Sequence, residues 1–114
     1  MQSVLRRIAE ALTAITGLKV YHYWRPQLEA PFCVWAEDGE GESQWANNHK
    51  TEQVIKGTVD YFTRTEFDSN VDAIQAQLNA LETCGWELNS VQYEDSTNLI
   101  HYEWRFEISG EMEV

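Results

Sequence analysis

The sequence predicts one α+β domain: a single mostly antiparallel sheet with two helices packed on one face. Three observations support this class. Apolar and polar residues alternate without a break over residues 100–108, which is typical of a strand with one buried and one wet face. Residues 32–36 are apolar on both faces, as in a strand covered from two sides. Segments 4–16 and 68–81 carry apolar residues at helical spacing.

The N-terminal half is predicted to form a helix and then two strands. Residues 4–16 form the helix, and Gly17 supplies its C-terminal stop. Residues 19–24 alternate in residue types that favour a strand, which Pro26 ends. The strand over residues 32–36 should lie centrally in the sheet, because neither of its faces is polar.

The acidic segment that follows is predicted to be a mobile loop over residues 37–50. Its first six residues, Glu-Asp-Gly-Glu-Gly-Glu, combine glycines that tolerate positive φ with carboxylates that prefer water. From residue 43 onward only Trp45 and Ala46 are apolar, so the stretch offers no core face of its own.

A long strand is predicted over residues 51–65, in which Gly57 marks a bulge or bend. The second helix should begin near Asp68 or Ser69, because Ser69 and Asp72 have the spacing of a loose capping box. The order of elements up to this point is therefore helix, three or four strands, helix.

The C-terminal part is predicted to be a two-strand hairpin. Gly85 should end the second helix, and residues 86–93 and 99–109 form the strands around a turn at 94–98. Residues 110–114 are expected to be a frayed tail. With no linker-like stretch, the chain is predicted to be one domain over residues 1–114.

Charge and composition exclude several function classes. The formal net charge of −11 repels phosphate backbones and anionic lipid headgroups, so neither specific nucleic-acid binding nor membrane binding is expected. No apolar run approaches the roughly 18 residues of a spanning helix, and a cytoplasmic origin is expected. Cys33 and Cys84 are far apart and are expected to be free thiols.

The candidate metal and nucleophile residues lack the required spacing. His22, His49 and His101 could bind zinc or act as bases only if folding brought them together. A nucleophilic Cys33 would need an electropositive, half-exposed pocket, yet it lies in the most apolar strand of an acidic chain.

The carboxylates and glycines give no stronger signal. Asp60 and Glu103 could form an acid/base pair only beside a cleft, and the run of acidic residues at 37–42 lacks the order of a calcium loop. Neither phosphate-binding glycine motif occurs. The sequence therefore predicts no catalytic residue, no cofactor, no metal site and no enzyme.

Most of the aromatic residues can be assigned to the core through the strand alternations. Trp45 is the exception, because it follows an acidic, glycine-containing tip. It either tucks back onto the sheet or anchors a partner, and an exposed aromatic beside carboxylates suits a subunit interface or a carbohydrate platform.

Residues 20–65 carry the stretches PFCVWAEDGEGE, NNHKTEQ and GTVDYFTRTE. Together with the following helix and closing hairpin, they resemble small tail-completion proteins of long-tailed phages and prophages, tail terminators included, particularly those of Gram-positive hosts. The resemblance spans nearly the whole chain in element order. It implies a homo-oligomeric ring, commonly of six subunits, at the head-proximal end of the tail in the virion, after assembly in the host cytoplasm.

In such a role the chain would cap the tail tube, stop its polymerisation and dock to head connector proteins. The loop would then order against a neighbouring ring, with Trp45 as anchor, or it would be an ordinary surface hairpin. The acidic character would suit a lumen that lets DNA pass. The predicted partner-contacting residues are Asp38, Glu40, Glu42, Trp45, His49 and Lys50.

Two alternatives stay open. Another head–tail joining or tail-tube subunit would give a different stoichiometry or filaments. A small carbohydrate- or ligand-binding module would use exposed Trp24 and Trp45, and it would be a monomer whose tryptophan fluorescence shifts with sugar.

Overall fold

The structure, a computed structural model, describes residues 1–25, 29–46 and 49–112. The helices and strands follow in the order α1 (Gln2–Thr13), β1 (Val20–His22), β2 (Phe32–Glu40), β3 (Gln44–Ala46), β4 (His49–Thr63), α2 (Ser69–Ala80), β5 (Cys84–Glu94) and β6 (Leu99–Glu111). This order confirms the predicted α+β class, including the closing hairpin.

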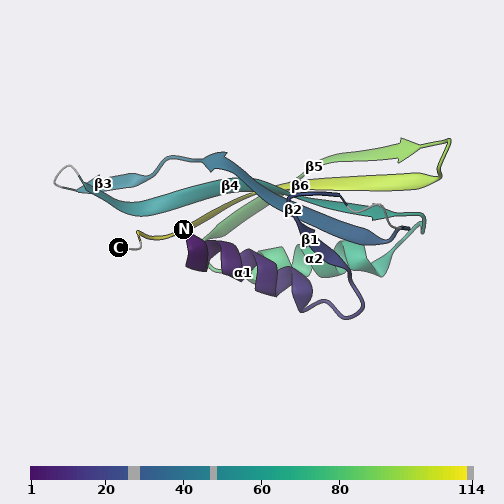
Figure 1. Cartoon of the computed structure of the whole chain (residues 1–114), viewed down its shortest axis with the longest axis horizontal. Coiled ribbons are helices and arrows are strands. Elements are labelled where there is room, and N and C mark those ends of the chain that lie inside the picture. The colour runs from purple at the N-terminus through teal and green to yellow at the C-terminus, as the bar shows by residue number, and fades with distance from the viewer. Residues whose placement is uncertain (26–28, 47–48, 113–114) are drawn as a thin grey trace.

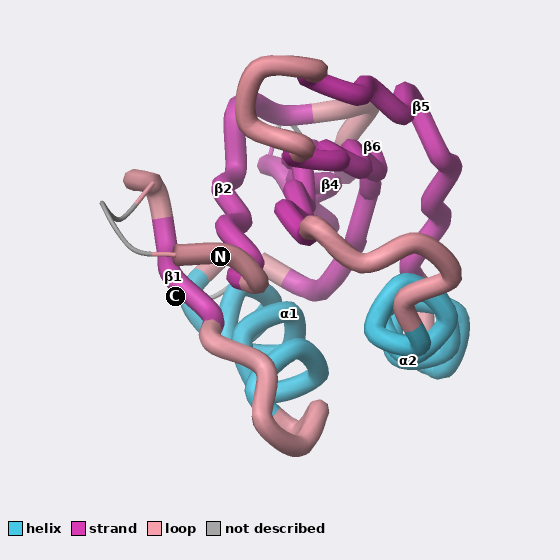
Figure 2. The backbone as a smooth tube through the Cα atoms, turned by 90° about the vertical axis from the view of Figure 1, so that its right-hand side faces the viewer, coloured by secondary structure: helices cyan, strands magenta, loops and turns pink. Residues whose placement is uncertain are grey.

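All strands belong to one sheet. Its order is β1-β2-β4-β6-β5, and the short β3 pairs with β4 beside this path. Only β1 and β2 are parallel among the described pairs, so the sheet is mostly antiparallel, as predicted. Both helices lie on the same face of the sheet (Figure 1). Viewed along the long axis, β1 and β5 lie on opposite sides of the molecule (Figure 2).

The main core lies between the sheet and the helices. Ile8 and Leu12 of α1 and Ile74 of α2 are fully buried against the sheet, where Trp104 and Phe106 of β6 are also buried. The apolar stripes of the two helices therefore cover the alternating apolar face of β6, as amphipathic patterns require.

Strand β2 is buried on both faces. Cys33 and Trp35 belong to the main core, whereas Phe32 and Val34 belong to a second cluster on the opposite face. The strand lies between β1 and β4, which confirms the predicted internal position.

Gly57 in β4 allows close packing rather than forming the bulge itself. A Cβ atom there would lie 2.3 Å from the carbonyl oxygen of Ala36 and 2.5 Å from the ring of Phe106. The register shift occurs on the partner strand, between Glu37 and Gly39 of β2. Only a residue without a side chain fits at this position.

The prediction of a loop over residues 37–50 is wrong for most of this segment. Residues 37–40 continue β2 and pair with β4, and the Gly41 amide donates to the Val54 carbonyl at 2.9 Å. Pairing satisfies the backbone, while Asp38 and Glu40 stay exposed and Glu37 bonds to neighbouring side chains, so acidic side chains do not prevent a strand. Residues 47–48 lie outside the described residues, and the mobility of the segment stays a prediction.

Helix α2 begins at Ser69, as predicted, but its capping residue and its end differ from prediction. Asp68, not Ser69, caps α2, because the Asp68 backbone is extended and its carboxylate accepts a hydrogen bond from the Asn70 amide at 2.9 Å. The helix ends at Ala80, so Gly85 lies in β5 instead of stopping the helix.

The C-terminal tail is ordered further than predicted. Gly110 and Glu111 belong to β6, and the Met112 amide donates to the Thr51 carbonyl at 3.1 Å. The length of β4 explains the difference, because it offers partners to the end of β6. Residues 113–114 lie outside the described residues.

Candidate assembly surfaces

The predicted partner-contacting residues lie on a projecting hairpin, here called the arm, which comprises residues 37–46 and 49–56. The arm extends beyond the helices at one end of the molecule (Figure 1), whose longest dimension is 55 Å. Asp38, Glu42 and His49 are exposed on it. The side chain of Trp45 lies outside the described residues, so its anchoring role stays a prediction.

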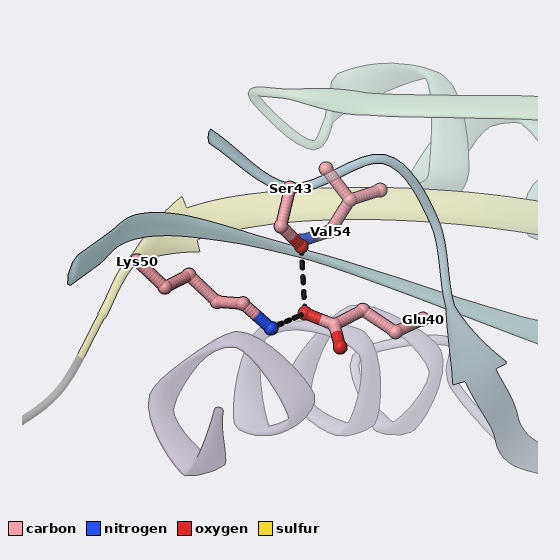
Figure 3. Close-up of polar contacts among 4 residues, drawn as sticks. All are labelled: Glu40, Ser43, Lys50 and Val54. Carbon is pink, nitrogen blue, oxygen red and sulfur yellow. Dashed lines mark hydrogen bonds and ion pairs between the residues drawn. The ribbon is translucent and has the colours of Figure 1, made fainter. Parts of the chain in front are cut away.

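The two strands of the arm are tied together through Glu40. Its Oε2 accepts hydrogen bonds from Lys50 Nζ and from Ser43 Oγ, each at 2.6 Å (Figure 3). Ser43 Oγ in turn accepts from the Val54 amide at 3.3 Å. The Lys50 ammonium and the Ser43 hydroxyl lower the pKa of Glu40. Glu40 and Lys50 therefore already have partners within the chain.

The three histidines do not come together. His22 Nε2 lies 2.7 Å from Glu37 Oε1, and His101 Nε2 lies 2.6 Å from Asp60 Oδ1, while His49 is exposed on the arm. Asp60 is thus paired with a histidine, although Glu103 is its register partner on β6. Within the described ranges, no three histidine, cysteine or acidic side chains gather in a way that could hold a metal ion.

Both cysteines are free, as expected. Cys33 is fully buried, and burial raises the pKa of its thiol well above the ordinary range, with a further increase from the nearby Asp60 carboxylate. Burial also raises the pKa of the half-buried Cys84 thiol. Neither thiol is poised to act as a thiolate nucleophile near neutral pH.

No helix in the described part of the chain is long and apolar enough to cross a membrane.

An apolar surface that the sequence pattern did not reveal lies at the end opposite the arm. The exposed fractions are 98% for Phe67, 46% for Leu88, 51% for Val91 and 58% for Tyr93. These four residues are here called the β5 surface. The strand residues of this surface lie on the helix-bearing face of the sheet, because their register partners on β6 do; these strand residues are Leu88, Val91 and Tyr93. They are exposed because β5 is at the edge of the sheet.

Phe67 and Tyr93 are connected through two hollows that share Ile100. Phe67 lines an open hollow of about 380 Å³ with Ile100 and Tyr102. Ile100 also lines a second hollow with Tyr93. Exposed apolar side chains grouped in this way mark sites of association more often than single scattered ones do.

A second exposed surface follows β1 on the other edge of the sheet. Tyr23 is 55% exposed and Trp24 is 71% exposed, and these two residues are here called the β1 surface. Tyr23 has a φ of 79° and stacks on His22 with ring centroids 3.7 Å apart. His22 stacks in turn on the buried Trp35 at 3.8 Å.

The Glu37 carboxylate bonds to two of the stacked side chains. It accepts hydrogen bonds from the Tyr23 hydroxyl and pairs with His22 Nε2. Burial acts to raise the pKa of Glu37, but the hydrogen bonds from Tyr23 and His22 outweigh burial, so the pKa is lowered. The exposed Tyr23 ring is therefore held in place by stacking on His22 and by its hydrogen bond to Glu37.

The assignment of most aromatic residues to the core does not hold for Tyr23 and Tyr93, which are exposed. Their strands alternate as core strands do, but no layer covers them, because β1 and β5 are the outermost strands. Strand order depends on long-range pairing, which a local alternation does not report.

No known family matches the sequence, and no curated protein matches it. Among solved structures, the chain is similar in fold to a chain of a structure described as "Virion of native gene transfer agent (GTA) particle". The TM-score is 0.58 at 15% sequence identity, and the match covers 98% of this chain and 95% of the other. At this identity the likeness shows the fold.

Proposed function

We propose that this chain is a structural virion protein, a tail-completion or terminator subunit that caps the tail tube as a ring and docks to the head connector. The observation that carries the proposal is the match to a chain of a gene transfer agent virion over nearly the full length of both chains. Since neither chain has a large unmatched part, the whole domain corresponds to a chain of that virion, and not merely a shared motif.

The exposed surfaces support an assembling subunit. The β1 and β5 surfaces are apolar, they lie on different edges of the sheet, and the main core does not cover them. A contact between two unlike surfaces of identical chains is heterologous, and repeated heterologous contacts close into rings when the rotation permits. Surfaces of this kind are also a reason to favour a structural role over an enzyme.

The arm is suited to contact a neighbouring ring. It projects along the long axis, beyond the helices, and presents the acidic Asp38 and Glu42 to solvent (Figure 1). Under this proposal residues 37–50 meet the tail-tube protein or a connector protein, with Trp45, His49 and Lys50 among the contacts. Carboxylates that face a lumen would keep DNA from adhering, because like charges repel.

The test is the mass of the purified chain in solution across concentration, with and without the tail-tube protein from the same genome. Multi-angle light scattering and electron microscopy should show rings, or tubes that stop growing once the chain is added. Filaments, or a stoichiometry unlike a capping ring, would indicate another head–tail joining or tube subunit. A monomer that leaves tube growth unchanged would contradict the proposal.

A ligand-binding module is the second candidate, because Trp24 is 71% exposed beside Tyr23. Sugars stack on exposed aromatic rings of this kind. The two functions separate in one titration: a sugar that shifts the tryptophan fluorescence of the monomer, and no longer does so in a Trp24→Ala variant, would favour the module.

A further inference from the structure

We propose that neighbouring copies of this chain join through opposite edges of their sheets, with the β1 edge of one copy packed on the β5 edge of the next. This inference deepens the proposed function and rests on it, because it names the surfaces through which copies assemble. It commits to a second copy of this chain as the occupant of the β5 surface.

The β5 edge is long, and its protection is limited to carboxylates and one register shift. In the part of the chain that the structure describes, β5 pairs only with β6, and its 11 residues, Cys84–Glu94, include neither proline nor lysine. Proteins usually protect an edge strand with such residues or with a cover. A register shift between Leu88 and Ser90 interrupts the edge, and the regular segment beyond it carries the exposed Val91 and Tyr93.

The charge of the β5 edge is of one sign. Residues 84–95 carry the carboxylates of Glu87, Glu94 and Asp95 and no lysine, arginine or histidine. All three carboxylate residues are exposed. Two β5 edges placed against each other would set like charges together, which costs free energy, so a β5-to-β5 contact between copies is disfavoured.

The β1 edge has the opposite sign. Residues 18–25 carry Lys19 and Arg25 and no carboxylate; Lys19 is exposed, whereas the Arg25 guanidinium lies over the Phe62 ring of β4, 4.5 Å from its centroid. The nearby carboxylate, Glu37, is already hydrogen-bonded to His22 and Tyr23 of the same chain. The β1 edge therefore offers exposed aromatic rings and positive charge to the apolar, negatively charged β5 edge.

The two edges are placed so that the contact can propagate. They lie on opposite sides of the molecule (Figure 2), so a copy bound through its β1 edge still presents a free β5 edge. Each added copy repeats the same head-to-tail contact. Such a series closes into a ring when the rotation per subunit divides the full turn.

Two single variants of the whole chain test the inference. Trp24→Asp damages only the β1 edge, and Val91→Asp damages only the β5 edge. Each variant alone should weaken self-association at least about tenfold in sedimentation velocity at concentrations where the wild type assembles. A mixture of the two should form one-to-one heterodimers and nothing larger, because each pair has one intact contact.

The matched control is Ala76→Asp, which adds the same charge at an exposed position on α2 that belongs to neither edge strand. Circular dichroism and thermal unfolding verify that each variant is folded. Where an aspartate variant fails to fold, the milder Trp24→Ser and Val91→Ser replace it.

The outcomes separate this inference from the proposed function. The edge contact is overturned if either edge variant assembles as well as the wild type, or if the mixture behaves like the separate variants. Capping of tubes by the wild type would still support the proposed function in that case. If the edge variants lose self-association as expected but the wild type leaves the growth of tail tubes unchanged, the contact is supported and the proposed function is overturned. A wild-type chain that stays monomeric even beside the tube protein overturns both.

Discussion

Strands β5 and β6 form one hairpin and share one apolar face, yet they differ sharply in burial. On β6, Trp104 and Ile108 are fully buried, whereas on β5 Leu88 and Val91 are about half exposed. The difference comes from position, because β6 lies between β4 and β5 while β5 is the last strand of the sheet. Apolar residues that folding leaves uncovered in this way remain available for association.

Polar contacts also differ between the covered part of the molecule and its exposed parts. The Asp68 carboxylate is partly buried at the start of α2 and accepts hydrogen bonds from the Tyr61 and Thr63 hydroxyls at 2.6 and 2.7 Å. The pair of Glu40 and Lys50 lies on the projecting arm. We expect substitutions in the covered middle of the sheet to alter stability most and those on its edges and arm to alter it least.

The largest effect is expected for Trp104→Ala. Trp104 is fully buried, and its indole Nε1 donates to Gln75 Oε1 at 3.0 Å. Removal of the ring leaves a cavity, and the free energy of unfolding should fall by about 3–5 kcal/mol in urea titration. The matched control is Leu88→Ala at the register partner of Trp104, which should cost less than about 1 kcal/mol. Equal losses would refute the contrast between β5 and β6.

A smaller loss is expected for Gly57→Ala. The added methyl group would overlap the Ala36 carbonyl and the Phe106 ring, so β2 or Phe106 must shift. Overpacking of this kind should lower the free energy of unfolding by about 1–3 kcal/mol in urea titration. Gly39→Ala is the control, because nothing lies within 4 Å of its Cβ position. If both variants lose the same stability, close packing at Gly57 is not the cause.

The next effect concerns pH and Asp68. Burial acts to raise the pKa of Asp68, but hydrogen bonds from Tyr61, the Asn70 amide and Thr63 lower it overall. A folded pKa below the unfolded value of about 3.9 stabilises the protein above that pH, and this contribution disappears as pH falls through the folded pKa.

Asp68→Asn keeps a good capping residue but removes the charged acceptor of the two hydroxyls. It should cost about 1 kcal/mol at pH 7 and progressively less below about pH 4, as measured by thermal unfolding across pH. Asp72→Asn, an exposed acid in the same first turn, is the control. A loss for Asp68→Asn that stays constant down to pH 2 would argue against this role of the carboxylate.

The smallest effect on stability is expected for Glu40→Gln on the arm. Glu40 is exposed, and water and salt screen its interaction with Lys50. The midpoint of thermal unfolding of Glu40→Gln should equal that of the wild type in both 50 mM and 500 mM sodium chloride. A clear salt-dependent drop in the midpoint of the wild type that Glu40→Gln abolishes would show that the arm contributes to folding after all.

Most of the fold followed from local patterns. Helical spacing identified both helices, and unbroken alternation identified β6 and its hairpin. The apolar run of β2 correctly predicted burial on two faces. The predicted contact residues on the arm remain a prediction. Exposed Tyr93 was missed, because nothing in its local sequence separates an edge position from a core position, and exposed Phe67 in the connection between β4 and α2 was missed as well.

The sequence by itself determined the α+β class, the order of the elements and the acidic charge, because periodicity and composition are properties of neighbouring residues. The tertiary structure alone decided that residues 37–40 pair as strand, that Asp68 rather than Ser69 caps α2, and that β1 and β5 are the sheet edges. The pairing of residues 37–40 and the strand order depend on which distant segments meet, whereas the cap depends on a local hydrogen bond between Asp68 and Asn70. Exposure of Trp24 and Val91, and the proposed contact between copies, follow from that strand order.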